Sequence, residues 1–146
     1  MPEWRLSACR AAAVLVLCAP LCACQRGNEQ LDEAALGRQL RTLSSLAAEG
    51  AFLARELRAG HLSPSFASVH LDDLAEDTDK ARSEIAKPAP SQLEPRHREA
   101  QALTEQLVQA WRTTAMARNG PDAPLQQREQ AFRRLHDAFD ALEGRR

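Results

Sequence analysis

The sequence predicts an all-α protein: an antiparallel up-down four-helix bundle behind an N-terminal signal peptide. The chain has 146 residues and is rich in alanine, leucine, arginine, glutamate and glutamine, which all favour helix. Apolar residues recur every three or four positions in four segments that are joined by short connections. Short connections favour antiparallel neighbours, and no alternating strand pattern or solenoid repeat competes with this interpretation.

The first helix is expected over residues 29–59. Asn28 is suited to cap it, and the acidic residues that follow suit the positive end of the helix dipole. Gly60 is a natural stop for the helix. The residues expected to face the core are Leu36, Leu40, Leu43, Ala47, Gly50, Ala54 and Leu57.

The second helix is expected to begin at Ser63 and Pro64. Serine caps a helix, and proline at the first helical position loses no hydrogen bond that the helix needs. The stretch 87–95 contains three prolines and is expected to form a stiff connector after this helix. The residues expected to face the core are Ala67, Leu71, Leu74, Thr78, Ala81 and Ile85.

The third helix is expected to begin within this connector, where Ser91 and Glu94 have the spacing of a capping box. Residues 119–121 should end it, and Asp122 is suited to cap the fourth helix. Trp111 lies one turn from core positions on either side, so we expect it in the core. The core positions of these two helices are Ala100, Leu103, Leu107, Ala110, Thr114, Ala117, Leu125, Arg128, Phe132, Leu135, Phe139 and Leu142.

Many of these core positions carry alanine, glycine or threonine, which bury little apolar area. A homodimer is therefore an open hypothesis for burying more of it.

Residues 1–23 have the pattern of a secretory signal peptide that is cleaved. Arg5 and Arg10 precede an uncharged apolar run at residues 11–21. Eleven helical residues rise about 16 Å, roughly half of the apolar core of a bilayer. A cleaved signal is therefore favoured over a permanent transmembrane helix.

The residues Leu21-Cys22-Ala23-Cys24 resemble the lipobox of bacterial lipoproteins. The resemblance covers residues 1–24 only, and Cys22 departs from the alanine or serine that is commoner before the small residue. It implies that Cys24 is lipidated, that cleavage occurs just before it, and that Cys24 becomes the first residue of the mature chain. Where the source is Gram-negative, Gln25 in place of an aspartate implies the outer membrane, facing the periplasm.

Residues 24–28 are then a short lipidated tether, and residues 29–146 form the helical bundle domain. All four cysteines lie in the first 24 residues. Cleavage would separate Cys22 from Cys24, so a redox or metal role for that pair is disfavoured.

One face of the second helix carries His70, Asp73 and Asp77 at helical spacing. This arrangement fits either a divalent-cation site or a histidine base oriented by a carboxylate. It also fits a solvated face, since a wider acidic arc lies roughly opposite the core stripe. A partner-binding surface is a further alternative. The arc consists of Asp72, Asp73, Glu76, Asp77, Asp79 and Glu84.

The remaining candidate side chains give weaker signals. Glu94 and His97 match the ExxH spacing of a bundle di-metal site, but such a site needs two of these motifs, so His97 is expected on the surface. His136 and Asp140 are expected to form a surface pair. Two phenylalanines, at positions 52 and 66, flank the core stripes and do not indicate an aromatic cage.

The sequence contains no GxSxG-like turn and no glycine-rich phosphate loop, so we expect no enzyme, no cofactor and no catalytic or metal-binding residues. The net charge of −1 gives no reason to expect nucleic-acid binding. We expect a membrane-anchored envelope lipoprotein with a small helical interaction or accessory domain. Its partners would be the membrane, through the lipid at Cys24, and an envelope protein. The alternative is a periplasmic module that binds a small molecule or a metal ion.

Overall fold

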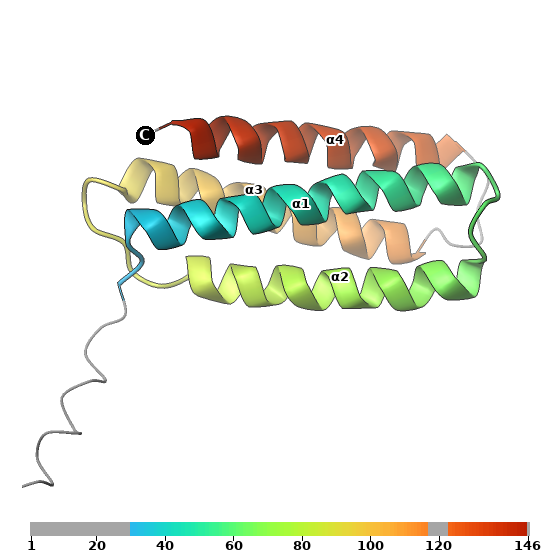
Figure 1. The fold of residues 1–146 in the computed structure, drawn as a ribbon, viewed down its shortest axis with the longest axis horizontal. Helices are drawn as coiled ribbons and strands as arrows, with labels where there is room; N and C mark the ends of the chain where they lie inside the picture. Colours follow the sequence, from blue (N-terminus) through green and yellow to red (C-terminus); the bar gives the residue numbers. More distant parts are fainter. Residues whose placement is uncertain (1–29, 117–122, 146) are drawn as a thin grey trace, which may run out of the picture.

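The computed structural model describes residues 30–116 and 123–145, and this part of the chain confirms the all-α four-helix bundle. The helices are α1 (Glu33–Arg58), α2 (Pro64–Ile85), α3 (Glu94–Met116) and α4 (Ala123–Gly144), with no strand between them in the described ranges. The start of α1, the α2–α3 connector and the end of α4 lie together at what we call the proximal end (Figure 1). The α1–α2 turn lies at the opposite, distal end.

Helix α1 begins four residues later than the sequence predicted, because Asp32 caps it. The Asp32 side chain accepts a hydrogen bond from the Ala35 N–H at 2.6 Å. The Leu31 N–H donates to the Pro88 carbonyl at 2.9 Å, so the chain is bound to the α2–α3 connector before the helix starts. The expected cap, Asn28, lies outside the described residues.

The turn between α1 and α2 has the predicted residues at its critical positions. Helix α1 ends at Arg58, and Gly60 adopts a φ of +75°, in the left-handed region that favours glycine. Ser63 caps α2 by accepting a hydrogen bond from the Phe66 N–H at 3.2 Å, and Pro64 takes the first helical position. The predicted stop of α1 and start of α2 are therefore confirmed.

Helix α3 begins at Glu94, so the capping box predicted from Ser91 and Glu94 does not form in that register. A capping box needs its glutamate at the third helical position, whereas Glu94 is the first helical residue. Pro95 lies in the first turn, where a missing N–H leaves no helical hydrogen bond unmade. Asp122, the expected cap of α4, and residues 119–121 lie outside the described ranges.

The predicted core stripes are largely confirmed. All six residues predicted to face the core from α2 are buried, and Trp111 is buried as expected. Ala117 lies outside the described residues. The expected core positions that are only partly buried are Leu57, Leu103, Ala110, Leu125 and Arg128. None of the helices in the described part of the chain has the length and hydropathy needed to cross a membrane.

A glycine on α1 allows a close approach in the middle of the bundle. A Cβ atom on Gly50 would lie 2.6 Å from the Trp111 ring and 2.8 Å from the Phe132 ring. These two rings pack against each other with centroids 4.4 Å apart. The indole N–H of Trp111 donates to Thr78 Oγ1 at 2.9 Å, which satisfies the buried donor and links α3 to α2.

Candidate interaction surface

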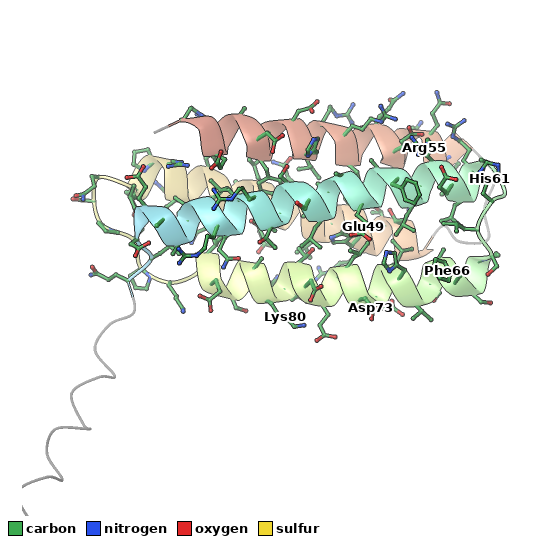
Figure 2. The ribbon with its side chains drawn as sticks, viewed as in Figure 1. Glu49, Arg55, His61, Phe66, Asp73 and Lys80 are labelled. Atoms are coloured by element: carbon green, nitrogen blue, oxygen red, sulfur yellow. The ribbon has the colours of Figure 1, made fainter. Side chains whose placement is uncertain are left out.

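Three large apolar side chains are exposed among the residues that the structure describes. They are Phe52 on α1 and Phe66 and Val69 on α2, with exposed fractions of 50%, 58% and 64%. We call these three residues the distal patch, because each lies within about two helical turns of the α1–α2 turn, close to which Figure 2 labels Phe66. Exposed aromatic residues that lie together are typical of surfaces that bind another protein.

Polar and ring contacts join the α1 and α2 sides of the distal patch. His70 Nε2 lies 2.7 Å from Glu49 Oε1 and so connects α2 to α1. The Phe66 ring stacks on His70, with centroids 6.1 Å apart and an interplanar angle of 27°. Glu49 lies three residues before Phe52 on the same face of α1. Glu49 and His70 therefore connect the α1 side of the distal patch to its α2 side.

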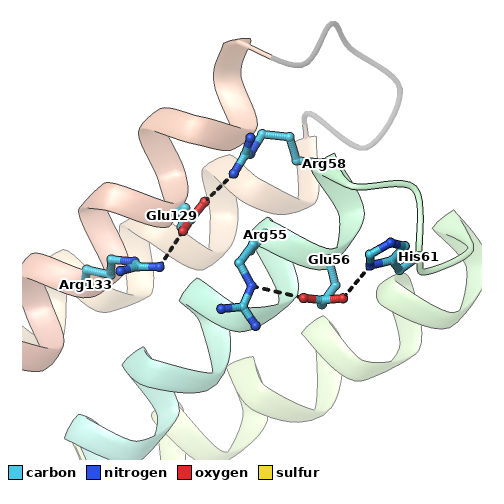
Figure 3. Close-up of polar contacts among 6 residues, drawn as sticks. All are labelled: Arg55, Glu56, Arg58, His61, Glu129 and Arg133. Carbon is cyan, nitrogen blue, oxygen red and sulfur yellow. Dashed lines mark hydrogen bonds and ion pairs between the residues drawn. The ribbon is translucent and has the colours of Figure 1, made fainter.

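The α1 side of the patch borders a hollow that leads toward α4. The Arg55 guanidinium lies 5.3 Å from the centroid of the Phe52 ring, a cation–π contact, and Glu56 holds Arg55 by an ion pair of 3.0 Å (Figure 3). A hollow that is bordered by an exposed ring can hold an apolar side chain of a partner protein. The hollow has a volume of about 180 Å³ and is lined by Ala48, Ala51, Phe52, Arg55, Arg133 and His136.

The structure pairs His70 with Glu49 of α1, and not with Asp73 as in one of the alternative interpretations of the sequence. Asp73 and Asp77 share its helix face but point to solvent, whereas Glu49 reaches His70 from the neighbouring helix. In the described ranges, no group of three or more histidine, cysteine, aspartate or glutamate side chains is placed to hold a metal ion.

The acidic arc of α2 is exposed at all six positions, as expected for a solvated face. Its ion pairs lie mostly within α2: Lys80 binds Glu76 and Asp77 at 3.0 Å each. Hydrogen bonds to these two carboxylates raise the pKa of Lys80. The arc begins at Asp72, one turn from Val69, so the acidic arc adjoins the distal patch along α2.

His97 was predicted to be a surface residue, and this prediction was wrong. Its side chain is buried, and Nε2 lies 2.5 Å from the Ile85 carbonyl oxygen at the end of α2. The last carbonyls of a helix lack partners within the helix, so this contact gives one of them a donor. Glu94 Oε2 is 4.0 Å from His97 Nδ1, and the pair adds no metal site.

His136 and Asp140 are paired as predicted, with His136 Nε2 at 3.6 Å from Asp140 Oδ2, but the sequence did not reveal their third partner. The buried Ser44 on α1 donates its hydroxyl proton to Asp140 Oδ1 at 2.5 Å and lies 2.7 Å from His136 Nδ1. Ser44 is 4% exposed, so its hydroxyl is shielded from solvent, and its contacts with His136 and Asp140 form a polar link between α1 and α4.

A second link between these helices lies close to the distal end, where the Glu129 carboxylate binds two arginines (Figure 3). Arg58 of α1 is 3.2 Å away and Arg133 of α4 is 2.7 Å away. Burial raises the pKa of Glu129, but the hydrogen bonds from Arg58 and Arg133 outweigh it and hold that pKa below its usual value.

The predicted lipidation site, Cys24, lies outside the described residues, as do Cys22 and Gln25. The distal patch was missed by the sequence reasoning, although its signal was present: Phe52 and Phe66 lie beside their core stripes and not on them. Comparison with known proteins found no family model, no curated sequence and no solved structure that matches the chain.

Proposed function

We propose that the chain is a lipid-anchored lipoprotein of the bacterial envelope whose bundle binds an envelope protein through the distal patch. The observation that carries this proposal is the separation of the two ends. The described chain begins at the proximal end, and Phe52 follows Glu33 by 19 residues of helix, about 28 Å. A bundle anchored through Cys24 would hold the patch away from its attached end.

The anchor would act by raising local concentration. Each buried methylene of an acyl chain contributes about 0.8 kcal/mol, and two or three chains make release from a membrane very slow. A bundle held in this way meets partners in the same membrane at a high effective concentration. A weak protein interface is then sufficient for a stable assembly.

The partner that fits this surface has an apolar pocket with a basic rim. Aromatic side chains such as Phe52 and Phe66 supply most of the binding energy when they fill a pocket. The acidic arc beside them would attract arginine and lysine side chains and orient the partner during encounter.

The anchor can be tested by labelling cells with a palmitate analogue. Wild type and Cys22→Ala should be labelled, whereas Cys24→Ala should lose the label, because Cys24 carries the acyl chains in this proposal. Cys22→Ala is the matched control, since it alters a neighbouring thiol that is discarded on cleavage. Label that persists on Cys24→Ala would refute the anchor.

The patch can be tested with a photoreactive amino acid placed at position 52 or 66 in living cells. Both positions should cross-link the same envelope protein, and the exposed Gln130 on α4 should not. The double charge reversal Asp73→Lys and Glu76→Lys should lower the yield severalfold, because it repels a basic rim. Equal cross-linking yields from positions 52 and 130 would show that the distal patch is not the binding surface. A cross-linking yield that is unchanged by the double charge reversal would show the same.

A further inference from the structure

An open groove lies at the proximal end of the bundle, bordered by the first turns of α1, the start of α3 and the end of α4. Its volume is about 630 Å³, and Arg38, Arg41 and Arg96 line it. Two small residues of α1, Ala34 and Gly37, also line it. Gly37 is buried beneath the groove, and a Cβ atom there would make one ordinary contact, with the Arg41 Nη1 at 3.8 Å, and no clash.

One of the three guanidinium groups is fixed in place. Arg96 donates from Nε to the Leu142 carbonyl and from Nη2 to the Glu143 carbonyl, at 3.0 Å each. Its side chain is only 13% exposed, and the remaining Nη1 lies 3.6 Å from Glu33 Oε1 in the groove. Since Arg96 is already ordered by the end of α4, a ligand that binds it costs little side-chain entropy.

The charges in the groove leave one arginine without a counter-charge. Arg41 pairs with Glu143 at 2.8 Å, and Arg96 pairs with Glu33. Within the described ranges, the one hydrogen bond of Arg38 outside the helix backbone is made by its carbonyl, which accepts from Thr42 Oγ1, and its guanidinium makes no hydrogen bond or ion pair. Three guanidinium groups against two carboxylates give an excess of one positive charge, which suits a monoanion.

Guanidinium groups bind phosphate oxygens through paired N–H donors, and a phosphodiester carries a single negative charge. The groove also lies at the end of the bundle nearest the proposed lipid anchor, where phospholipid headgroups would be abundant. Leu31 is fixed at this end by its hydrogen bond to Pro88, and six residues separate it from Cys24. Seven residue steps span at most about 25 Å, which brings the groove within reach of the headgroups around an acylated Cys24.

We propose that this groove binds the phosphodiester of a phospholipid headgroup and that the bundle stands with its proximal end on the membrane. The supply of lipid beside the groove rests on the anchor proposed above. Recognition itself depends on Arg38, Arg41, Arg96 and the space over Gly37, so it can be measured separately.

The test uses phenylglyoxal, which modifies arginine side chains, on the acylated protein purified from cells. With the protein in neutral detergent, glycerophosphoglycerol should slow modification of Arg38 severalfold and leave the exposed Arg134 of α4 unchanged. Inorganic phosphate at the same concentration should protect Arg38 less. No protection by glycerophosphoglycerol would overturn the proposal, and equal protection by phosphate would indicate a site for free anions.

The second arm uses vesicles made of phospholipid or of an uncharged galactolipid. Flotation of the protein with both kinds of vesicle would support the lipid anchor. Slower modification of Arg38 on phospholipid vesicles, but not on galactolipid vesicles, would support binding in the groove. The variant Gly37→Leu should float normally but lose this protection, because it fills the groove and keeps every charge. Protection that survives Gly37→Leu would mean that the bilayer merely shields Arg38, which overturns the site.

Discussion

The α1–α4 interface and the outer face of α2 both carry many charged side chains, yet they use them differently. Across the interface, the polar contacts join one helix to the other. On the outer face of α2, the acidic side chains pair mainly with basic residues three or four positions away on the same helix. The contacts between the helices are Arg41–Glu143, Ser44–Asp140 and Arg58–Glu129.

The difference separates the residues that hold the bundle from those that can meet a partner. Contacts between helices fix their register, whereas ion pairs within one exposed helix contribute only a few tenths of a kcal/mol. A partner can therefore replace the ion pairs of Lys80 on α2 without loosening the bundle. Four substitutions test this contrast.

The largest effect is expected for Gly50→Ala. A Cβ atom at this position would lie within 3 Å of the Trp111 and Phe132 rings, so the packing must shift. Overpacking of this kind costs about 1–3 kcal/mol, more than the roughly 1 kcal/mol that alanine gains over glycine in a helix. The difference predicts that the free energy of unfolding, measured in urea, falls by up to about 2 kcal/mol.

Gly37→Ala is the matched control on the same helix. Its Cβ atom has room, so the alanine should be neutral or should stabilise the protein by up to about 1 kcal/mol. If both variants had the same stability, close packing of α1 at Gly50 would be refuted.

A smaller loss is expected for Ser44→Ala, which removes the hydroxyl that links α1 to Asp140 and His136. Losing such a hydrogen bond costs about 1 kcal/mol. The neighbouring Ser45 is exposed, so Ser45→Ala should change the unfolding free energy by less than about 0.5 kcal/mol. Thermal and urea unfolding of the two variants side by side would show whether the contact between the helices matters.

The third prediction concerns acid. Because the pKa of Glu129 is lowered in the folded protein, its contribution to stability is complete above the unfolded value of about 4.3. That contribution is lost as the pH falls through the folded value. At pH 7, wild type should be more stable than Glu129→Gln by about 0.5–1 kcal/mol. Between pH 5 and pH 3 this advantage should shrink, because wild type loses the contribution of Glu129 and the variant has none to lose. Parallel pH profiles for the two proteins would contradict the link.

The smallest effect is expected on the outer face of α2. Asp79 is exposed and pairs with Arg82 at 3.5 Å, so Asp79→Asn should change the unfolding free energy by less than about 0.5 kcal/mol. Urea unfolding in low and high salt would measure this. A loss as large as that of Ser44→Ala would mean that the face helps to hold the bundle, and the contrast with the α1–α4 interface would fail.

Local sequence patterns predicted most of the fold. The spacing of apolar residues predicted all six core positions of α2. The turn before α2 was predicted from Gly60, Ser63 and Pro64. These predictions succeeded because the signals act within one or two helical turns. The start of α1 was predicted four residues too early, because Asn28 was the predicted cap whereas Asp32 caps the helix, and Leu31 is held by a contact with the α2–α3 connector that local spacing does not reveal.

The partners of polar side chains could not be predicted, because they depend on how neighbouring helices are placed. His70 shares a face with Asp73, but Glu49 of α1 lies closer. His97 was assigned to the surface, but a carbonyl at the end of α2 holds it inside. The open groove beside Gly37 likewise exists only once α4 has packed beside α1. Sequence spacing describes one helix at a time, whereas these contacts and the groove are formed by residues from two or three helices.

The hydrogen bond from Leu31 to Pro88 has a mechanical consequence. Leu31 is buried and its backbone is bound to the α2–α3 connector, so a pull on the N-terminus does not load α1 alone. The load is divided between the first turn of α1 and the connector between two other helices. Tension on the N-terminus must therefore break the hydrogen bond between Leu31 and Pro88 before it can unwind α1 alone.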